Sequence, residues 1–341
     1  MSNPYRPIEE FPGQLFQERT WLEGAILLGV AYGVELTVFC MSFHLLFQQT
    51  TRSNLNKNGP LMLYISALFI LGTLFMASAA RMTQLAFIDN RNYPGGPAQF
   101  EVDMFSIPVD NLGNVAFVIA NWLADGLMVW RWYVIYQGCG VPMWVVMALP
   151  GLMLTGSFTM GILFLIQVSA LSPWDATTVN FTLPYFLLSL ILNIISTIAI
   201  VTRLLYYRRR TSKALGTAYG AQYTSIAAMV VESAALYSIS SILFLVPFIL
   251  NHPIQNTFLQ MLSPVQVIAP LLIILRVAQG KAWSGATANA LTSQKSSAIK
   301  MGNLSNMSGA SATLKSGFST TSGVTISQDV YIDGRGKFAD V

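Results

Sequence analysis

The sequence predicts an all-α integral membrane protein, built as a seven-transmembrane helix bundle. Of its 341 residues, 53% are hydrophobic and only 10% are charged, and seven apolar runs are long enough to cross a bilayer. Soluble domains carry about 25% charged residues, so this chain lacks the polar surface that water requires. A crossing helix needs about 20 mostly apolar residues, because each residue rises about 1.5 Å through a hydrocarbon core of about 30 Å.

The seven predicted spans are separated by shorter polar connections. They cover residues 24–47, 60–80, 113–136, 143–168, 182–206, 223–250 and 256–277. Backbone groups have no water partners in lipid, so the runs must be helices or a closed barrel, and continuous apolarity excludes the alternating barrel pattern. The chain is thus divided into an N-terminal segment at 1–22, the bundle at 23–283 and a tail at 284–341.

The basic residues near the span ends predict the orientation, because cytoplasmic connections are enriched in Lys and Arg. One set of connections holds most of them: Arg52, Lys57, Arg208, Arg209, Arg210, Lys213, Arg276 and Lys281. The other set is rich in acids: Asp89, Glu101, Asp103, Asp110 and Asp175. The N-terminus is therefore predicted outside and the C-terminus in the cytoplasm, and we expect the plasma membrane as the location.

Two segments outside the spans have distinctive compositions. The connection at 82–112 contains Asn-Tyr-Pro-Gly-Gly-Pro and is predicted to be turn-rich, either a simple connector or a lid over an exterior pocket. Residues 284–328 include 11 Ser and 6 Thr and no acid. A segment of that composition buries too little apolar surface to offset its ordering entropy, so we expect a disordered tail.

Four charged residues fall inside predicted spans, where charge costs about 2.5–3.5 kcal/mol on insertion scales and marks candidate functional positions. Glu35 is central in the first span, Asp125 is central in the third, and Glu232 is in the inner half of the sixth. Arg131 lies near the inner end of the third span. No metal-ligand pattern or cofactor motif accompanies them.

Arg131 and Glu232 each have a structural and a functional interpretation. Arg131 could extend to the inner interface among neighbouring aromatic residues, or pair with Glu232. Glu232 could fix helix packing, hold an ion or proton, or act as a switch. Helical spacing predicts that it shares one stripe with Ser225, Met229, Leu236 and Ser240.

Several classes of protein are excluded because the sequence lacks the residues that they require. No span has a central lysine, which excludes a retinal Schiff base as in opsins. His44 and His252, the two histidines, cannot form a histidine box or an H-E-x-x-H zinc site. No glycine-rich phosphate loop or Ser/His pairing is evident, so we expect no enzyme, and nothing suggests a nucleic-acid partner.

Three segments of the sequence share one resemblance: NWLADGLMVWRWYVI at 121–135, YTSIAAMVVESAALYS at 223–238 and PLLIILRVAQGKAW at 270–283. They resemble an uncharacterised seven-transmembrane family of mushroom-forming (basidiomycete) fungi. The resemblance covers about residues 20–285, and Trp132 is a mild departure from it. It implies the seven-span fold and a fungal membrane, and it supplies no ligand or activity.

Two functional hypotheses remain. The seven-span layout, the basic Arg208, Arg209, Arg210 and Lys213 cluster and the Ser/Thr-rich tail favour a receptor-like sensor that acts on a cytoplasmic signalling protein. Its third span lacks the Asp/Glu-Arg-Tyr motif of rhodopsin-like receptors, so the likeness is one of layout. The acids Glu35, Asp125 and Glu232 at membrane depth favour an ion- or proton-coupled transporter or channel.

Overall fold

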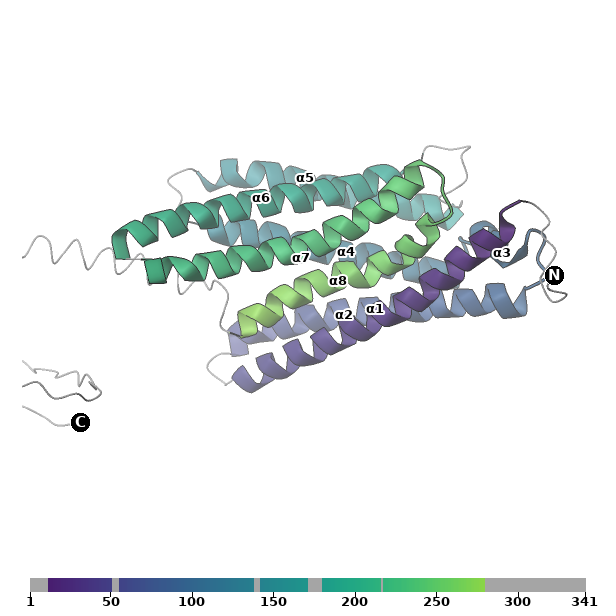
Figure 1. Cartoon of the computed structure of the whole chain (residues 1–341), viewed down its shortest axis with the longest axis horizontal. Helices are drawn as coiled ribbons and strands as arrows, with labels where there is room; N and C mark the ends of the chain where they lie inside the picture. The colour runs from purple at the N-terminus through teal and green to yellow at the C-terminus, as the bar shows by residue number, and fades with distance from the viewer. Residues whose placement is uncertain (1–11, 51–54, 138–141, 171–179, 216, 280–341) are drawn as a thin grey trace, which may run out of the picture. The chain divides into compact units, whose positions relative to one another are not determined.

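The computed structural model describes residues 12–50, 55–137, 142–170, 180–215 and 217–279 (Figure 1). Their elements, in chain order, are α1 (Gln14–Gln49), α2 (Leu55–Gln84), the π-helical turn η1 (Leu85–Asp89), α3 (Gly96–Asp103), α4 (Pro108–Tyr136), α5 (Met143–Ala170), α6 (Thr182–Leu215), α7 (Thr217–Ile249) and α8 (Gln255–Ala278). The predicted tail, Cys139 and the side chain of Lys213 lie outside the described residues.

Seven of these helices are long and apolar enough to cross a bilayer, which confirms the predicted all-α seven-helix bundle. The spans fall close to the predicted ranges, but several helices are longer than the apolar runs. α1 begins at Gln14, ahead of the predicted bundle boundary, and α6 continues to Leu215. Polar ends extend the helices past the apolar core because a helix satisfies its own backbone hydrogen bonds in water as well as in lipid.

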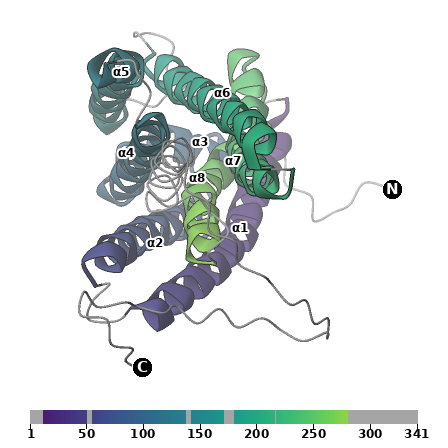
Figure 2. The ribbon, with the colours of Figure 1, turned by 90° about the vertical axis from the view of Figure 1, so that its left-hand side faces the viewer.

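The helices differ in how far they are enclosed by the others. In the most apolar stretch of each, 72% of α8 residues and 61% of α4 residues are buried, against 22% for α1 and α2. Viewed along the bundle, α8 lies among α1, α2, α4 and α7 (Figure 2). α4 also packs against α2, α5 and α6, so α4 and α8 form the centre of the bundle.

Large apolar side chains cover the outside of the bundle. On α1, Ile26 and Val30 are 61% and 64% exposed, and on α5 Leu152 is 71% exposed. Such a surface is stable only against hydrocarbon, because water disfavours broad apolar patches. The chain is therefore a multi-pass membrane protein.

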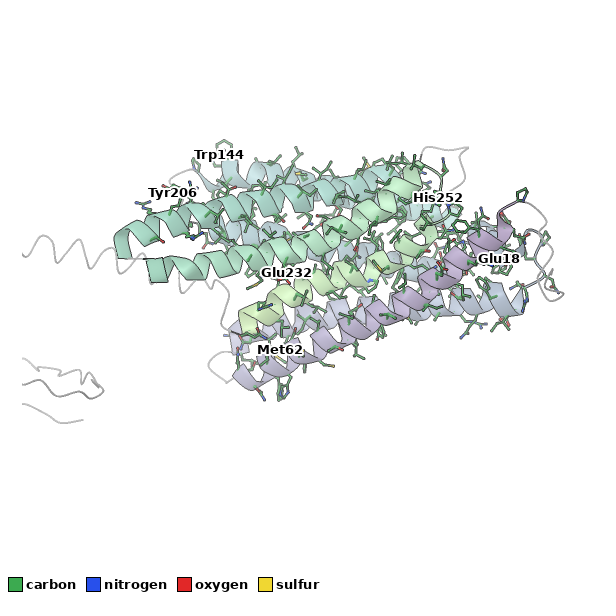
Figure 3. The ribbon with its side chains drawn as sticks, in the orientation of Figure 1. Glu18, Met62, Trp144, Tyr206, Glu232 and His252 are labelled. Carbon is green, nitrogen blue, oxygen red and sulfur yellow. The ribbon has the colours of Figure 1, made fainter. Side chains whose placement is uncertain are left out.

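The bundle has two ends. Glu18 and His252 lie at the end where α1 begins, and Trp144 and Tyr206 lie at the other (Figure 3). We call these the amino-terminal end and the opposite end. The basic Arg208–Arg210 run is at the opposite end, so the positive-inside prediction assigns that end to the cytoplasm.

The connection predicted to be turn-rich contains a short helix, α3, at the amino-terminal end (Figure 1). Gly95 and Gly96 adopt φ values of 82° and 80°, which residues with a Cβ rarely adopt, and they turn the chain into the helix. Ala98 and Phe100 are buried there, and Phe100 packs with Met82 and Ala86. This connection, predicted as either a simple connector or a lid, is folded, and we call α3 and η1 together the cap.

Candidate functional site

Asp125, a predicted site residue on α4, is the centre of a buried polar cluster. Ser157 of α5 donates a hydrogen bond to its Oδ2 at 3.0 Å, and Ser189 of α6 lies 3.2 Å from its Oδ1. The Ser189 hydroxyl is also 2.9 Å from the hydroxyl of Tyr237 on α7. The carboxylate thereby joins three neighbouring helices to α4.

A second part of the cluster lies one turn away on α4. The Asn121 amide donates to the Tyr185 hydroxyl of α6 at 3.0 Å, and its Oδ1 lies 3.2 Å from the Ser189 hydroxyl. We call Asn121, Asp125, Ser157, Tyr185, Ser189 and Tyr237 the Asp125 cluster; all six are buried. Hydrogen bonds between membrane helices contribute about 0.6 kcal/mol each on average, so the cluster fixes geometry more than it adds stability.

A cavity lies between the Asp125 cluster and the amino-terminal end; we call it the first cavity. Its volume is about 70 Å³, several times the roughly 10–15 Å³ that one water molecule needs. Residues from α1, α2, α3, α4, α5, α6, α7 and α8 contribute to its wall. Eight aromatic side chains line it: Trp21, Phe75, Phe105, Phe117, Phe164, Phe186, Phe244 and Phe248.

The polar groups of the first cavity are mostly oxygen atoms. Glu101 of α3 and Asp110 of α4 both line it. Asp110 accepts a hydrogen bond from Asn114 at 3.0 Å, whereas Glu101 Oε1 has no hydrogen-bond partner among the described residues. Oε1 of Gln260 and the Thr182 hydroxyl are also buried without a partner there. Residues of the cavity wall therefore carry buried acceptor atoms that a donor could satisfy.

Glu101 belongs to α3 and is only 3% exposed. Burial, with a smaller contribution from the charge of Asp110, raises the pKa of its carboxyl to about 8. The carboxyl is therefore largely protonated near neutral pH, and a positive charge nearby favours its ionised form.

The floor of the first cavity is in direct contact with the Asp125 cluster. Phe186 lines the cavity, and its chain neighbour Tyr185 belongs to the cluster, with their ring centroids 5.2 Å apart. Phe164, another lining residue, stacks on Tyr185 at 5.3 Å. On α4, Phe117 of the cavity and Asn121 of the cluster are one turn apart, about 6 Å along the axis.

A second, smaller cavity of about 30 Å³ lies on the other side of the cluster. Asn121, Asp125 and Tyr237 of the cluster line it, together with Asn193 and Gln266. The Gln266 amide donates to the Phe117 carbonyl at 2.9 Å, and its Oε1 has no partner among the described residues. The two cavities thus follow one another along α4, separated by the aromatic floor and the cluster.

Glu35 lies apart from both cavities. It is fully buried between α1 and α2, and a Cβ added at Gly72 would be 2.8 Å from its Cδ. Neither carboxylate oxygen has a hydrogen-bond partner among the described residues. Between these helices, the hydroxyls of Tyr32 and Thr73 are 3.0 Å apart.

Glu232 and Arg131 do not meet. Glu232 is exposed on α7 (Figure 3), while Met229 and Ser240 of the same stripe are buried, so the stripe lies at the boundary between the exposed and the buried side of the helix. The sequence could not show which side of this helix is buried, because almost every residue around the stripe is apolar. Arg131 is half-buried, and no ion pair joins it to an acid within the described ranges.

The predicted coupling residues lie at the opposite end of the bundle. Arg208, Arg209 and Arg210 are all exposed at the end of α6. One turn closer to the membrane, the Arg203 guanidinium packs over Tyr207 at 4.5 Å and over Tyr136 of α4 at 5.5 Å. The exposed guanidinium groups are therefore available to a partner, whereas Arg203 holds α6 against α4.

Among the predicted candidates whose side chains the structure describes, Asp125 is the one that lies together with other polar side chains and a cavity. Sequence reasoning missed Ser157, Ser189, Tyr185 and Tyr237 because each is a single polar residue in an otherwise apolar run. It treated Glu101 only as an exterior acid. A buried acid in the cap could have been suspected from its position between Phe100 and Val102.

The fold and the site define a seven-helix multi-pass membrane protein with a capped aromatic cavity above a buried polar cluster. Comparisons with family models, with curated proteins and with solved structures give no match for this chain.

Proposed function

We propose that the protein is a receptor-like sensor in which a ligand occupies the first cavity and alters the opposite end of the bundle through the Asp125 cluster. The observation that carries this proposal is the contact between the first cavity and the Asp125 cluster. Phe186 belongs to the cavity wall and touches Tyr185, whose hydroxyl accepts from Asn121. A group that displaces Phe186 changes the packing of Tyr185 directly.

The cluster is suited to pass on such a change because it joins α4, α5, α6 and α7. Ser189 on α6 is within hydrogen-bond distance of both Asp125 and Tyr237, so α6 and α7 share one set of partners with α4. A ligand shifts the bundle only by the difference in its affinity for two arrangements. Ser189 and Tyr237 lie 3.2 and 3.5 Å from Asn121 Oδ1, and either of their hydroxyls can donate to the other, so an exchange of donors within the cluster is the second arrangement that we propose.

The readout is proposed at the cytoplasmic ends of α6 and α7. Arg208, Arg209 and Arg210 are exposed there, and a cytoplasmic signalling protein with an acidic surface is the expected partner. We place the protein in the plasma membrane of a fungus, in keeping with the proposed family resemblance of residues 20–285.

A chemical group attached covalently inside the first cavity tests this proposal without a known ligand. In a background without Cys40 and Cys139, Thr83→Cys places a thiol on the cavity wall, and a benzyl methanethiosulfonate fills the cavity. Amide hydrogen exchange in residues 203–230 is expected to change by about fivefold or more, the size of a typical coupling free energy. Ser169→Cys, an exposed position at the same end on α5, is the matched control. Equal effects from both thiols, or no effect from either, contradict the proposal.

A proton- or ion-coupled transporter is the second candidate, favoured by the succession of two cavities along α4 with Asp125 between them. Glu35 lines neither cavity and Glu232 is exposed, which leaves Asp125 as the acid of such a path. Proton flux into proteoliposomes that is present in the native chain and lost in Asp125→Asn supports transport. A native chain without flux, together with altered exchange in the tethered protein, supports the sensor.

A further inference from the structure

We propose that the first cavity binds a protonated organic amine, held by the carboxylates of Glu101 and Asp110 and by the surrounding aromatic rings. The inference rests on the proposed function in taking this cavity as the ligand site of the sensor. It goes further by naming the chemical class of the ligand.

The charged residues in the wall of the first cavity favour a cationic ligand. Glu101 and Asp110 both line the cavity, and no Lys, Arg or His is among the described residues that do. The neighbouring elements carry charges of both signs: Glu18 of α1 lies against Gly96, Asp103 belongs to α3, and Asp89 of η1 pairs with Arg81 of α2 at 3.5 Å. Arg19 of α1 and Arg91 are exposed and do not line the cavity. Two acids without a balancing cation favour a positively charged occupant.

The unsatisfied acceptors are the second argument. Glu101 is 3% exposed, and its Oε1 has no hydrogen-bond partner among the described residues; the same holds for Gln260 Oε1. Buried acceptors normally have a donor. An ammonium group brings up to three N–H donors on one small head, whereas a carboxylate or an ether brings none.

The aromatic lining is the third argument. Rings such as Trp21, Phe105 and Phe248 form much of the wall around the two acids. A cation near aromatic rings is attracted by their quadrupoles, and recognition of ammonium groups commonly combines rings with an acid. A bare metal ion fits less well, because no group of three His, Cys, Asp or Glu side chains gathers among the residues that the structure describes.

The proposal also predicts a dependence on pH. Since the pKa of Glu101 is about 8, binding of a cation ionises the carboxyl and releases a proton. The ionisation of Glu101 alone therefore raises the affinity between pH 6 and pH 8 by at most about tenfold per pH unit, and this contribution levels off above, while an alkylammonium group stays charged throughout because its pKa is about 10.

The probe is 2-phenylethylammonium, with propylbenzene as its neutral analogue, titrated into the purified full chain and followed by tryptophan fluorescence. The amine is expected to bind, and Glu101→Gln with Asp110→Asn is expected to weaken it by about tenfold or more. Asp103→Asn, an exposed acid on the same helix, is the matched control and should leave the affinity unchanged. Binding of propylbenzene should be insensitive to all three substitutions and to pH.

Two results overturn this inference: an amine affinity equal in the native chain and in the Glu101/Asp110 variant, or binding of propylbenzene alone. Either result identifies a purely apolar cavity and leaves the sensor proposal standing. Conversely, amine binding that depends on both acids, without altered exchange at residues 203–230, supports the amine site and rejects the sensor. Circular dichroism and thermal unfolding of the variants establish that they are folded.

Discussion

Phe186→Ala is expected to lower the free energy of unfolding by about 2–4 kcal/mol. Phenylalanine-to-alanine substitutions in packed cores cost about 3–5 kcal/mol, and we place this one slightly lower because helices in lipid gain less from apolar transfer. The side chain is 2% exposed and packs against Phe117, Phe164 and Phe244, with the last ring centroid 4.9 Å away. The space left by the missing ring becomes part of the first cavity.

Reversible unfolding in mixed micelles measures this effect, with Phe47→Ala as the matched control. Phe47 is 64% exposed near the end of α1, so its removal should cost less than about 1 kcal/mol. Similar losses for the two variants would show that Phe186 does not form the packed floor between the cavity and the Asp125 cluster.

Gly72→Leu is expected to destabilise the bundle by about 1–3 kcal/mol, the usual cost of overpacking. Even a single Cβ at Gly72 would lie 2.8 Å from Glu35 Cδ and 2.9 Å from its Oε2. Because Glu35 is fully buried, the larger leucine side chain must displace its carboxyl group or push α1 and α2 apart. Gly33→Leu on α1 is the matched control, because nothing lies within 4 Å of a Cβ there.

Shortening Glu35 should relieve the clash. In a double-mutant cycle, Glu35→Ala combined with Gly72→Leu is expected to recover about 0.5–3 kcal/mol relative to the sum of the single changes. Additive effects would contradict the close approach of the two residues.

The spans could be predicted from the sequence because bilayer thickness sets a length that any apolar run either meets or misses. The depth of a residue in the membrane could be predicted in the same way, from its place in an apolar run, which is why Asp125, Glu35 and Glu232 were all recognised as membrane acids. The rotation of each helix about its own axis could not be predicted. Lipid and protein core are equally apolar, so sequence patterning did not distinguish buried Glu35 from exposed Glu232.

The first cavity depended on information that no local pattern carries. Glu101 becomes a cavity residue because Gly95 and Gly96 turn the chain into α3, and because α3 then packs against α1 and η1. Ser157 and Ser189 become partners of Asp125 only through the packing of α5 and α6 on α4. Such contacts join residues 32 and 64 positions apart, beyond the reach of helical periodicity.

The central claim is that occupancy of the first cavity reaches the opposite end of the bundle through the Asp125 cluster. Its most direct test is hydrogen exchange at residues 203–230 in the benzyl-tethered Thr83→Cys protein, with and without Ser189→Ala. Ser189 contacts Asp125 and Tyr237, whereas Ser66 donates only to the Met62 carbonyl of its own helix at 2.8 Å. The account predicts that the change caused by the tether is lost in Ser189→Ala and retained in Ser66→Ala. An undiminished change in Ser189→Ala would contradict it.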